Sequence, residues 1–309
     1  MKNIDIHADD YALTINTSKD MLECMRQGVL DSISIICNMP CFDECMDLLY
    51  KEIPGLPFLP LISVHIDLIE GDSVSKDVPL MSKNDVMSLS WKDVFFMSFG
   101  SKRNELKKEL KKEIKAQIDK VWDVTQKCMK IAEDNNVPCA QKAIRIDSHQ
   151  HIHSLPIVWE SLMEVIDEND YEVEYIRNPK EPLLPFISEV SLWSTYRPIN
   201  FVKNRLLMFY SKRNDEYCEK KNMQKMYMWG LVMSGKMDID RIRKLYPKML
   251  EKAQKDNRRL EILFHPGLTL EEEKCSEIAE DALKDFYLSE NRHIEKDAVM
   301  RTKKEIMGV

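Results

Sequence analysis

The chain has 309 residues, a hydrophobic fraction of 44% and a formal net charge of −7. These values are typical of one large α/β domain or two modest ones, and they argue against a disordered chain. The negative charge argues mildly against nucleic acid or an anionic membrane as the main partner, although a local basic patch is compatible with it.

We expect no export signal and no membrane-spanning segment. No apolar run reaches the roughly 20 residues that cross a bilayer, and acidic residues occur from Asp5 onward. The eight cysteines form no CxxC pair, which is typical of buried thiols in a reducing compartment. The sequence therefore predicts a cytoplasmic protein that binds neither nucleic acid nor a membrane.

Alternating apolar and polar residues predict short strands, and longer periodic segments between them predict helices. The predicted strands cover residues 3–8, 32–37, 61–68, 143–146, 171–176 and 260–264. Helices are predicted over 14–28, 41–51, 104–135, 156–169 and 240–255, near 200–210 and 219–234, and from Glu271 onward. This alternation predicts βα units around a parallel sheet, and the lack of repeats or linkers predicts a single domain.

The clearest helix is the one predicted over 104–135. Apolar side chains recur along one face, and lysines and glutamates are expected on the other faces. The lysine pairs at 107–108 and 111–112 indicate a solvated face rather than a nucleic-acid patch. The apolar stripe comprises Leu106, Leu110, Ile114, Ile118, Val121 and Thr125.

The stretch 143–153 reads A-I-R-I-D-S-H-Q-H-I-H and holds three of the seven histidines. If the strand continues through it, His149, His151 and His153 share one side, because residues two apart face the same way. Such a group suits a metal, since neutral imidazole is the commonest protein ligand of transition metals. The alternative is a surface loop that is rich in histidine.

Titratable side chains also occur near the ends of other predicted strands. Asp9 and Asp10 follow the first strand, His65 lies late in the third, and His149 and His265 follow two later strands. In a β/α barrel the carboxyl ends of the strands share one rim, where active sites are built. Simpler interpretations are a helix cap for the two aspartates, a core position for His65 and a turn for His265.

Four separated blocks, H-A-D-D-Y, V-H-I-D-L, I-D-S-H-Q-H-I-H and H-P-G, resemble the YdjC/ChbG carbohydrate deacetylase family in sequence and order. The resemblance extends over 2–268, which contains all the catalytic blocks. It implies a β/α barrel, distorted or incomplete, related to polysaccharide deacetylases and spanning 1–309 as one domain. Region 179–237 is then expected to shape the substrate site, and 269–309 to be a helical C-terminal part.

The resemblance implies a role for each of five residues. The metal ligands fall on Asp10, His65 and His149, the general base on Asp9 and the general acid on His265. A metal held by one carboxylate and two imidazoles keeps positions open, so it can activate water and polarise a carbonyl. Relatives are commonly described with Mg²⁺, whereas the softness of this donor set suits Zn²⁺, Mn²⁺ or iron.

Four further residues are candidates for supporting or substrate-binding roles. Asp147 is expected to orient a metal-binding imidazole through its second nitrogen. His151 and His153 are expected near the metal or the substrate. Arg177 follows the strand over 171–176 and is a candidate to bind sugar hydroxyls or the carboxylate of the base, the alternative being an ordinary surface arginine.

The resemblance implies a metal-dependent hydrolase that removes the acetyl group from an N-acetylated sugar or oligosaccharide and releases acetate. It also implies a homodimer. Two alternatives stay open at this point. One is a metal-dependent hydrolase of another bond, such as a phosphoester, because Asp/His sites also serve that chemistry. The other is a sugar-binding protein that has lost catalysis.

Overall fold

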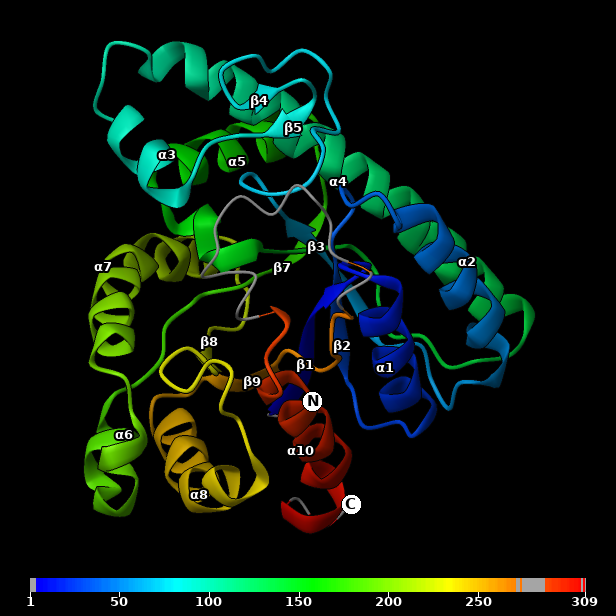
Figure 1. Ribbon diagram of the computed structural model, residues 1–309, viewed down its shortest axis with the longest axis vertical. Coiled ribbons are helices and arrows are strands. Elements are labelled where there is room, and N and C mark those ends of the chain that lie inside the picture. Colours follow the sequence, from blue (N-terminus) through cyan, green and yellow to red (C-terminus); the bar gives the residue numbers. More distant parts are fainter. Residues whose placement is uncertain (1–3, 271–272, 274–286, 307, 309) are drawn as a thin grey trace.

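Seven parallel strands form one curled sheet in the computed structural model, which describes residues 4–270, 273, 287–306 and 308 (Figure 1). Their order is β7-β6-β3-β2-β1-β9-β8, so β7 and β8 are the two edges of an open barrel. This architecture confirms the predicted α/β fold with an incomplete β/α barrel. The strands are β1 (Ile4–Tyr11), β2 (Ser32–Ile35), β3 (Leu61–Ile66), β6 (Ile144–Ser148), β7 (Val173–Ile176), β8 (Met226–Trp229) and β9 (Arg259–Phe264).

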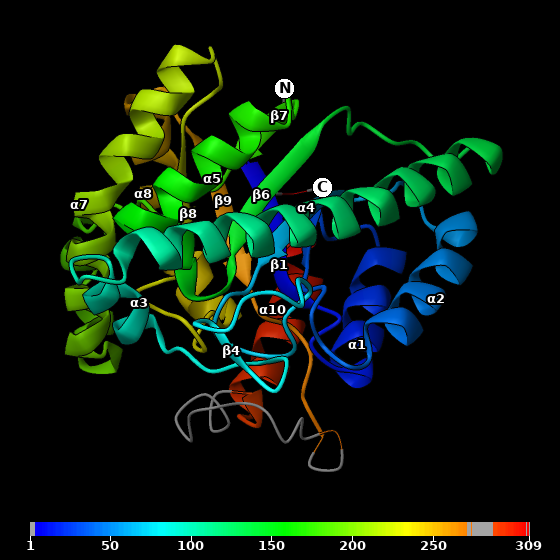
Figure 2. The same cartoon turned by 90° about the horizontal axis from the view of Figure 1, so that it is seen from above.

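Helices surround the outer side of the curled sheet, as two perpendicular views show (Figures 1 and 2). The long helices are α1 (Ile15–Arg26), α2 (Phe42–Glu52), α4 (Arg103–Asp134), α5 (Pro156–Glu168), α7 (Pro198–Lys220), α8 (Ile239–Lys255) and α10 (Asn291–Ile306). The shorter elements are the helices α3 (Trp91–Met97) and α6 (Leu184–Ser188), the 3₁₀ turns η1 (Ile53–Gly55), η2 (His149–Ser154) and η3 (Val190–Thr195), and the hairpin β4 (Ser82–Lys83) and β5 (Val86–Met87). No strand or helix was predicted from the sequence between residues 68 and 104, where α3 and this hairpin lie.

The strands have an apolar outer face and a polar inner face, because successive side chains point in opposite directions. Outer-face residues such as Ile6, Ile33 and Ile262 are fully buried in the core between sheet and helices. Inner-face residues line the inside of the open barrel and contact one another there. They are Asp5, His7, Asp9, Ser32, Ser34, His65, Arg145, Asp147, Tyr175, Arg177 and Glu261.

The predicted helix over 104–135 is confirmed as α4, and its predicted apolar stripe is buried. The expectation that all its glutamates occupy outer faces is wrong for Glu109 and Glu113, which are also buried. The Glu109 carboxylate accepts hydrogen bonds from the backbone N–H groups of Leu80 and Met81, and Glu113 does the same for Val74 and Ser75. These two glutamates fasten the loop that follows β3 to the helix.

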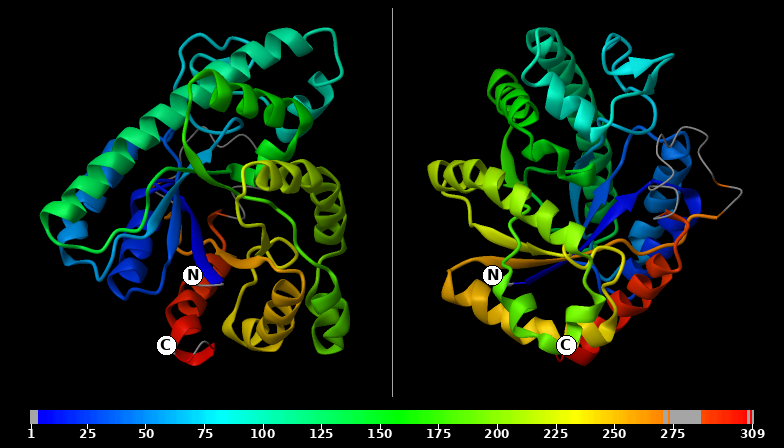
Figure 3. Two further views of the ribbon diagram at one scale, coloured as in Figure 1. Left: turned by 180° about the vertical axis from the view of Figure 1, so that it is seen from behind. Right: turned by 60° about the vertical axis from the view of Figure 1, so that its left-hand side comes forward.

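Region 179–237 contains α6, η3, α7 and β8. The helix predicted near 200–210 is confirmed as part of α7, but the one predicted over 219–234 is wrong, because β8 lies there as the seventh strand. α7 covers the open side of the barrel (Figure 3). Leu207 of α7 packs with Met228 and Leu263 from the inner side of β8 and β9, so apolar packing replaces the polar network at this edge.

A backbone contact brings the two edges of the sheet together. The Met228 N–H donates to the carbonyl oxygen of Lys180 at 3.1 Å. The buried carboxylate of Glu181 accepts hydrogen bonds from the backbone N–H groups of Gly230, Leu231 and Val232. The segment that follows β7 therefore occupies the gap that an eighth strand fills in a closed barrel.

The helical end predicted from Glu271 is confirmed over α10, whereas 271–272 and 274–286 lie outside the described residues. In the described part of the chain, no helix combines the length and the apolar character needed to cross a bilayer.

Candidate active site

The two adjacent aspartates at the end of β1 point to different neighbours because the strand bulges there. Ala8 pairs with Ile33 and Tyr11 with Ile35, so one extra residue lies between these pairs on β1. Asp10 also has a positive φ of 71°. A bulge of this kind redirects a side chain. Asp9 consequently stays on the inner face, while Asp10 turns toward His65 and His149.

Asp10, His65 and His149 form a buried group whose ligand atoms converge. The Oδ1 atom of Asp10 lies 3.6 Å from Nε2 of His65 and 3.5 Å from Nδ1 of His149. This oxygen has no hydrogen-bond partner among the described residues. Ligand bonds of about 2.1 Å to a tetrahedral ion place neighbouring donor atoms about 3.4 Å apart. The three residues therefore fit a divalent cation.

Both imidazoles are oriented by a hydrogen bond on the nitrogen that faces away from Asp10. For His65, Nδ1 lies 2.6 Å from Oδ1 of Asp147, so the imidazole–carboxylate contact anticipated for Asp147 is present. For His149, Nε2 lies 2.9 Å from the hydroxyl of Tyr287, which donates to Glu70. Such contacts favour the tautomer whose other nitrogen is the acceptor that a metal needs.

Asp9 lies in a fixed setting of cationic and polar partners. Arg177 donates to both of its oxygens, with each bond 2.8 Å long, and Nε2 of His7 lies 3.0 Å from Oδ1. Burial raises the pKa of Asp9, but Arg177, His65 and His7 lower it more, so that it lies well below its usual range. Asp9 is therefore a carboxylate at neutral pH.

Arg177 is fully buried, which excludes the surface alternative considered for it. Its Nε donates to Glu261 at 2.7 Å, and a terminal nitrogen lies 3.3 Å from Asp147. One guanidinium thus contacts three carboxylates. Two of these, Asp9 and Asp147, form with His7 a second group whose ligand atoms lie close enough together to hold a metal. Because hydrogen bonds already occupy these atoms, the second group suits a polar network better than a metal.

His265 follows β9 and is the most accessible of the candidate catalytic side chains, with 15% of its side chain exposed. Its Nε2 lies 4.0 Å from Oδ2 of Asp9. Glu295 of α10 accepts a 2.7 Å hydrogen bond from the backbone N–H of His265, and its carboxylate lies 3.6 Å from Nδ1. This glutamate fixes the position from which His265 faces Asp9.

The histidines of the stretch 149–153 do not continue a strand, so the prediction that they share one side is wrong. They form η2, in which Gln150 and His151 have positive φ angles. His153 lies behind the site, where Nε2 donates to the carbonyl oxygen of Arg177 at 2.9 Å and Nδ1 contacts Ser148. Burial is the main cause that lowers its pKa to about 4, so it is neutral. His151 is buried, and its Nδ1 lacks a hydrogen-bond partner among the described residues.

The C-terminal residues 287–295 supply three contacts that were not predicted from the sequence. Tyr287 contacts His149, Arg292 donates to Oδ2 of Asp10 at 3.0 Å, and Glu295 contacts His265. These residues belong to no motif and lie far along the chain from their partners. The inner-face residues His7 and Glu261 were also missed, although the alternation of Asp5, His7 and Asp9 on β1 was a usable signal.

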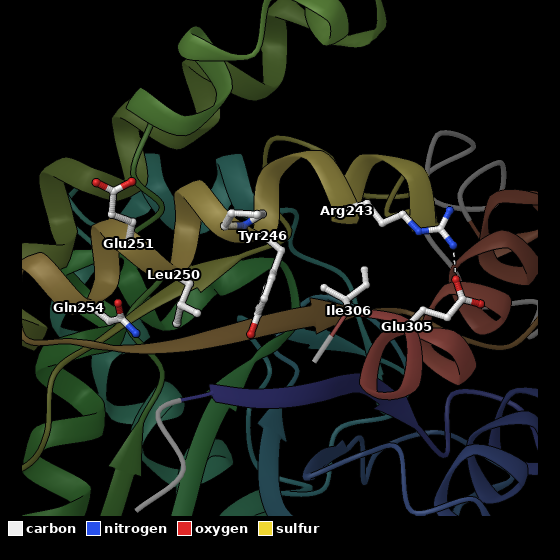
Figure 4. Close-up of a pocket in the computed structure, with 8 residues that line it drawn as sticks. Arg243, Tyr246, Leu250, Glu251, Gln254, Glu305 and Ile306 are labelled. Carbon is white, nitrogen blue, oxygen red and sulfur yellow. Dashed lines mark hydrogen bonds and ion pairs between the residues drawn. The ribbon is translucent and has the colours of Figure 1, made fainter. Parts of the chain in front are cut away.

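A separate cavity of about 480 Å³ lies between α8 and α10 (Figure 4). Arg243, Tyr246, Leu250 and Glu305 are among the residues that line it. None of the strand-end residues contributes to this lining, so the cavity is distinct from the candidate active site.

Comparison with known proteins places this chain in a family. The model of the family described as YdjC-like protein matches residues 3–128 and 142–305, and so covers every residue of the candidate site. The chain belongs to the YdjC-like protein family. The resemblance inferred from the four sequence blocks is thereby confirmed.

Several curated relatives of this YdjC-like chain carry the name carbohydrate deacetylase. One from Thermoanaerobacter pseudethanolicus is 40% identical over 76 residues, covering 24% of this chain and 28% of the relative. One from Brevibacillus brevis is 24% identical over 170 residues, covering 55% and 58%. One from Danio rerio is 26% identical over 181 residues, covering 59% and 51%. The matched segments thus span between about a quarter and three fifths of these relatives.

A solved structure shares the fold of this chain. It is an Enterococcus faecalis protein described as a cellobiose-phosphate cleavage protein. The TM-score is 0.54 at 16% identity, and the match covers 97% of this chain and 95% of the other. At this identity the likeness supports the fold alone.

Proposed function

We propose that this YdjC-like protein is a metal-dependent hydrolase that removes the acetyl group from an N-acetylated sugar or oligosaccharide and releases acetate. The proposal rests on the different surroundings of two adjacent carboxylates, Asp9 and Asp10. Asp10 has an unpaired oxygen facing two imidazole nitrogens, whereas Asp9 is held by Arg177 on the inner face. The names of the curated relatives support the choice of reaction.

In this proposal Asp10, His65 and His149 hold the metal. When bound, a divalent cation polarises the acetyl carbonyl and lowers the pKa of water, which are the two effects that a poorly reactive amide requires. Two imidazoles among three donors favour Zn²⁺ or Mn²⁺ over Mg²⁺, because Mg²⁺ prefers an all-oxygen set.

Asp9 acts as the general base. Its low pKa keeps it ionised, and Arg177 and His7 hold it in one orientation. Transfer of a proton to a positioned carboxylate contributes about 10²–10⁴-fold to a rate. Both oxygens accept a hydrogen bond from Arg177. The Oδ2 atom is the better acceptor, because Oδ1 also lies 3.0 Å from His7 and 3.9 Å from His65, whereas Oδ2 lies 4.0 Å from the partly exposed His265.

His265 acts as the general acid that protonates the departing amine. It lies across from Asp9 and is partly exposed, so a sugar can reach both groups at once. With 4.0 Å between Nε2 of His265 and Oδ2 of Asp9, base and acid lie side by side, and in this proposal both reach the scissile amide from neighbouring positions. His151 is buried close enough to Asp9 and His265 for their charges to shift its pKa, and its Nδ1 has no hydrogen-bond partner among the described residues. We assign it to binding the sugar.

The structure offers less support for a phosphoester substrate. A phosphate site needs cationic side chains directed at the ligand, and the two buried arginines near the candidate ligands are engaged by carboxylates. Arg177 contacts Asp9 and Glu261, and Arg292 contacts Asp10.

The direct test is acetate release from N,N′-diacetylchitobiose, with and without a chelator. Wild type should release acetate, and the chelator should abolish the reaction until metal is restored. Asp9→Asn and His149→Ala should each lower the rate by about 10³-fold or more, within the range of a lost proton transfer or metal ligand. Lys304→Ala, at an exposed position on α10, is the matched control. Acetate release that survives both substitutions contradicts the proposed site, and phosphate release from a sugar phosphate in its place supports the phosphoester alternative.

A further inference from the structure

Exposed apolar side chains gather on one side of the molecule. Among the described residues, the exposed large hydrophobic side chains belong to α3 and the turn after it, to α6 and η3, or to α7. The exception is Ile294. Two perpendicular views place α3 and α7 on the same side (Figures 1 and 2). Single exposed apolar residues are ordinary, but a gathering of this kind marks a surface that binds something.

The outward side of α7 forms the centre of this surface. Val202, Leu206 and Phe209 recur at the spacing of one helix face and are 63%, 38% and 77% exposed. The inward side of the same helix is occupied by other residues, among them Leu207 and Asn214, which pack on the barrel. The outward stripe therefore contributes nothing to the core, and folding alone does not account for it.

The same segment is basic, although the whole chain is acidic. Residues 190–214 contain five basic residues and no Asp or Glu, in a chain whose net charge is −7. Acidic residues return at the C-terminal end of α7 with Asp215, Glu216 and Glu219, and Glu216 lies 3.6 Å from Lys212. All five basic side chains are exposed. They are Arg197, directly before α7, and Lys203, Arg205, Lys212 and Arg213 of α7.

We propose that the outward face of α7, together with η3 and α3, docks the protein onto the surface of an anionic phospholipid bilayer. Helices that lie in a membrane interface combine Trp, Phe and Leu with Lys and Arg on their flanks, and Trp193 on η3, the 3₁₀ turn that precedes α7 in the chain, is 54% exposed. Exposed Lys and Arg side chains extend toward the headgroups while their aliphatic parts rest on apolar surface. Docking of this kind is peripheral and needs no spanning helix.

The charge of the surface argues against a second copy of this chain as the occupant. A twofold-symmetric interface brings the same patch of each copy together. Here that contact sets mainly like charges against each other, because Glu216 is the acidic residue next to the stripe and it is already paired with Lys212. Like charges across an interface are unfavourable. An anionic lipid surface offers both the apolar interior and the opposite charge. The net acidic composition is no obstacle, because the basic residues are local.

The test uses the full chain in a flotation assay with phosphatidylcholine vesicles and with vesicles of equal parts phosphatidylcholine and phosphatidylglycerol. Wild type should float with the anionic vesicles only, and less so as salt rises. Each basic residue near an anionic surface changes partitioning about fivefold, so Lys203→Glu/Arg205→Glu should lower binding at least about 25-fold. Val202→Ser/Phe209→Ser should abolish binding, because it removes the apolar contact.

Matched controls separate this face from a general effect. Lys130→Glu/Lys304→Glu makes the same charge change at exposed positions on α4 and α10, and Ile294→Ser removes the exposed apolar residue outside the surface. These variants should float like wild type. Absence of wild-type flotation, or equal losses in test and control variants, overturns the proposal. Self-association in sedimentation velocity that Val202→Ser/Phe209→Ser abolishes, without flotation, assigns the surface to a second copy instead. The assay measures no acetate, so its outcome is independent of the proposed reaction.

Discussion

The two faces of the same sheet have different tasks. The outer face is apolar, with residues such as Ile6, Ile33 and Ile262 buried under the helices. The inner face is a connected set of charged and polar side chains with Arg177 near its centre. Since side chains alternate along a strand, a single strand serves both faces. Stability is thus concentrated on one side and chemistry on the other, and substitutions can separate the two.

Replacing Arg177 should damage both tasks. Arg177→Met leaves Asp9, Asp147 and Glu261 buried without their shared cation. Removal of one partner from a buried ion pair costs about 3–5 kcal/mol, so the free energy of unfolding in urea should fall by that amount. Acetate release should also fall, because Asp9 loses its orientation. Arg177→Lys should recover part of the stability but little of the activity, since lysine cannot bond both oxygens of Asp9 in one plane. A stable and active Arg177→Met variant would contradict the inner-face account.

Replacing an outer-face residue should damage stability alone. Ile262→Ala leaves a cavity in the core and should lower the free energy of unfolding by about 2–5 kcal/mol. The rate per folded molecule should equal that of wild type, because Ile262 points away from the inner face. Urea unfolding and acetate release from the same preparation check both statements. A loss of kcat in the fully folded variant would show that the two faces are coupled.

The C-terminal contact to His149 should affect metal binding more than folding. Tyr287→Phe removes the hydroxyl between His149 and Glu70. Loss of such an outer contact weakens metal binding about 10–100-fold. Titration with Zn²⁺ or Mn²⁺ should therefore show a weaker affinity, and excess metal should restore acetate release. If excess metal restores nothing, Tyr287 has a role other than orienting this ligand.

The contact between the barrel edges should make stability depend on pH. Burial raises the pKa of Glu181 from an ordinary value of 4.5 to about 7. Hydrogen bonds from the backbone N–H groups act in the opposite direction and lower it. The folded state then holds more protons than the unfolded state between these values. The contribution of Glu181 to the free energy of unfolding should fall by about 3 kcal/mol as pH rises from about 4.5 to about 7. Above that pH it should stay constant. Urea unfolding at pH 5 and pH 8 should show this loss in wild type relative to Glu181→Gln. Parallel pH dependences in the two proteins would exclude the effect.

Much of the fold was predictable from the sequence, and so was the convergence of the strand-end residues in the candidate site, for a physical reason. Strand alternation and helical periodicity record which face is buried, so the strands around Ile33 and Ile262 and the helix α4 were predicted. The motif blocks lie at strand ends that the topology brings together. Contacts from Tyr287, Arg292 and Glu295 were not predictable, because they depend on how α10 packs and have no local pattern. The turn at His149–Ser154 was misassigned because alternating histidines imitate a strand, and β8 was missed because its four residues show no clear alternation.

The most direct test of the account asks whether Asp10 binds the metal and Asp9 acts as the base. The metal content of purified wild type, Asp9→Asn and Asp10→Asn should be determined by elemental analysis, together with acetate release from each. The account predicts that Asp9→Asn keeps its metal and loses activity, because Asp9 supplies the base and is held by Arg177. Asp10→Asn should lose both, because its unpaired oxygen faces the two imidazoles. Equal metal content in Asp10→Asn and wild type, or loss of metal in Asp9→Asn alone, would contradict it.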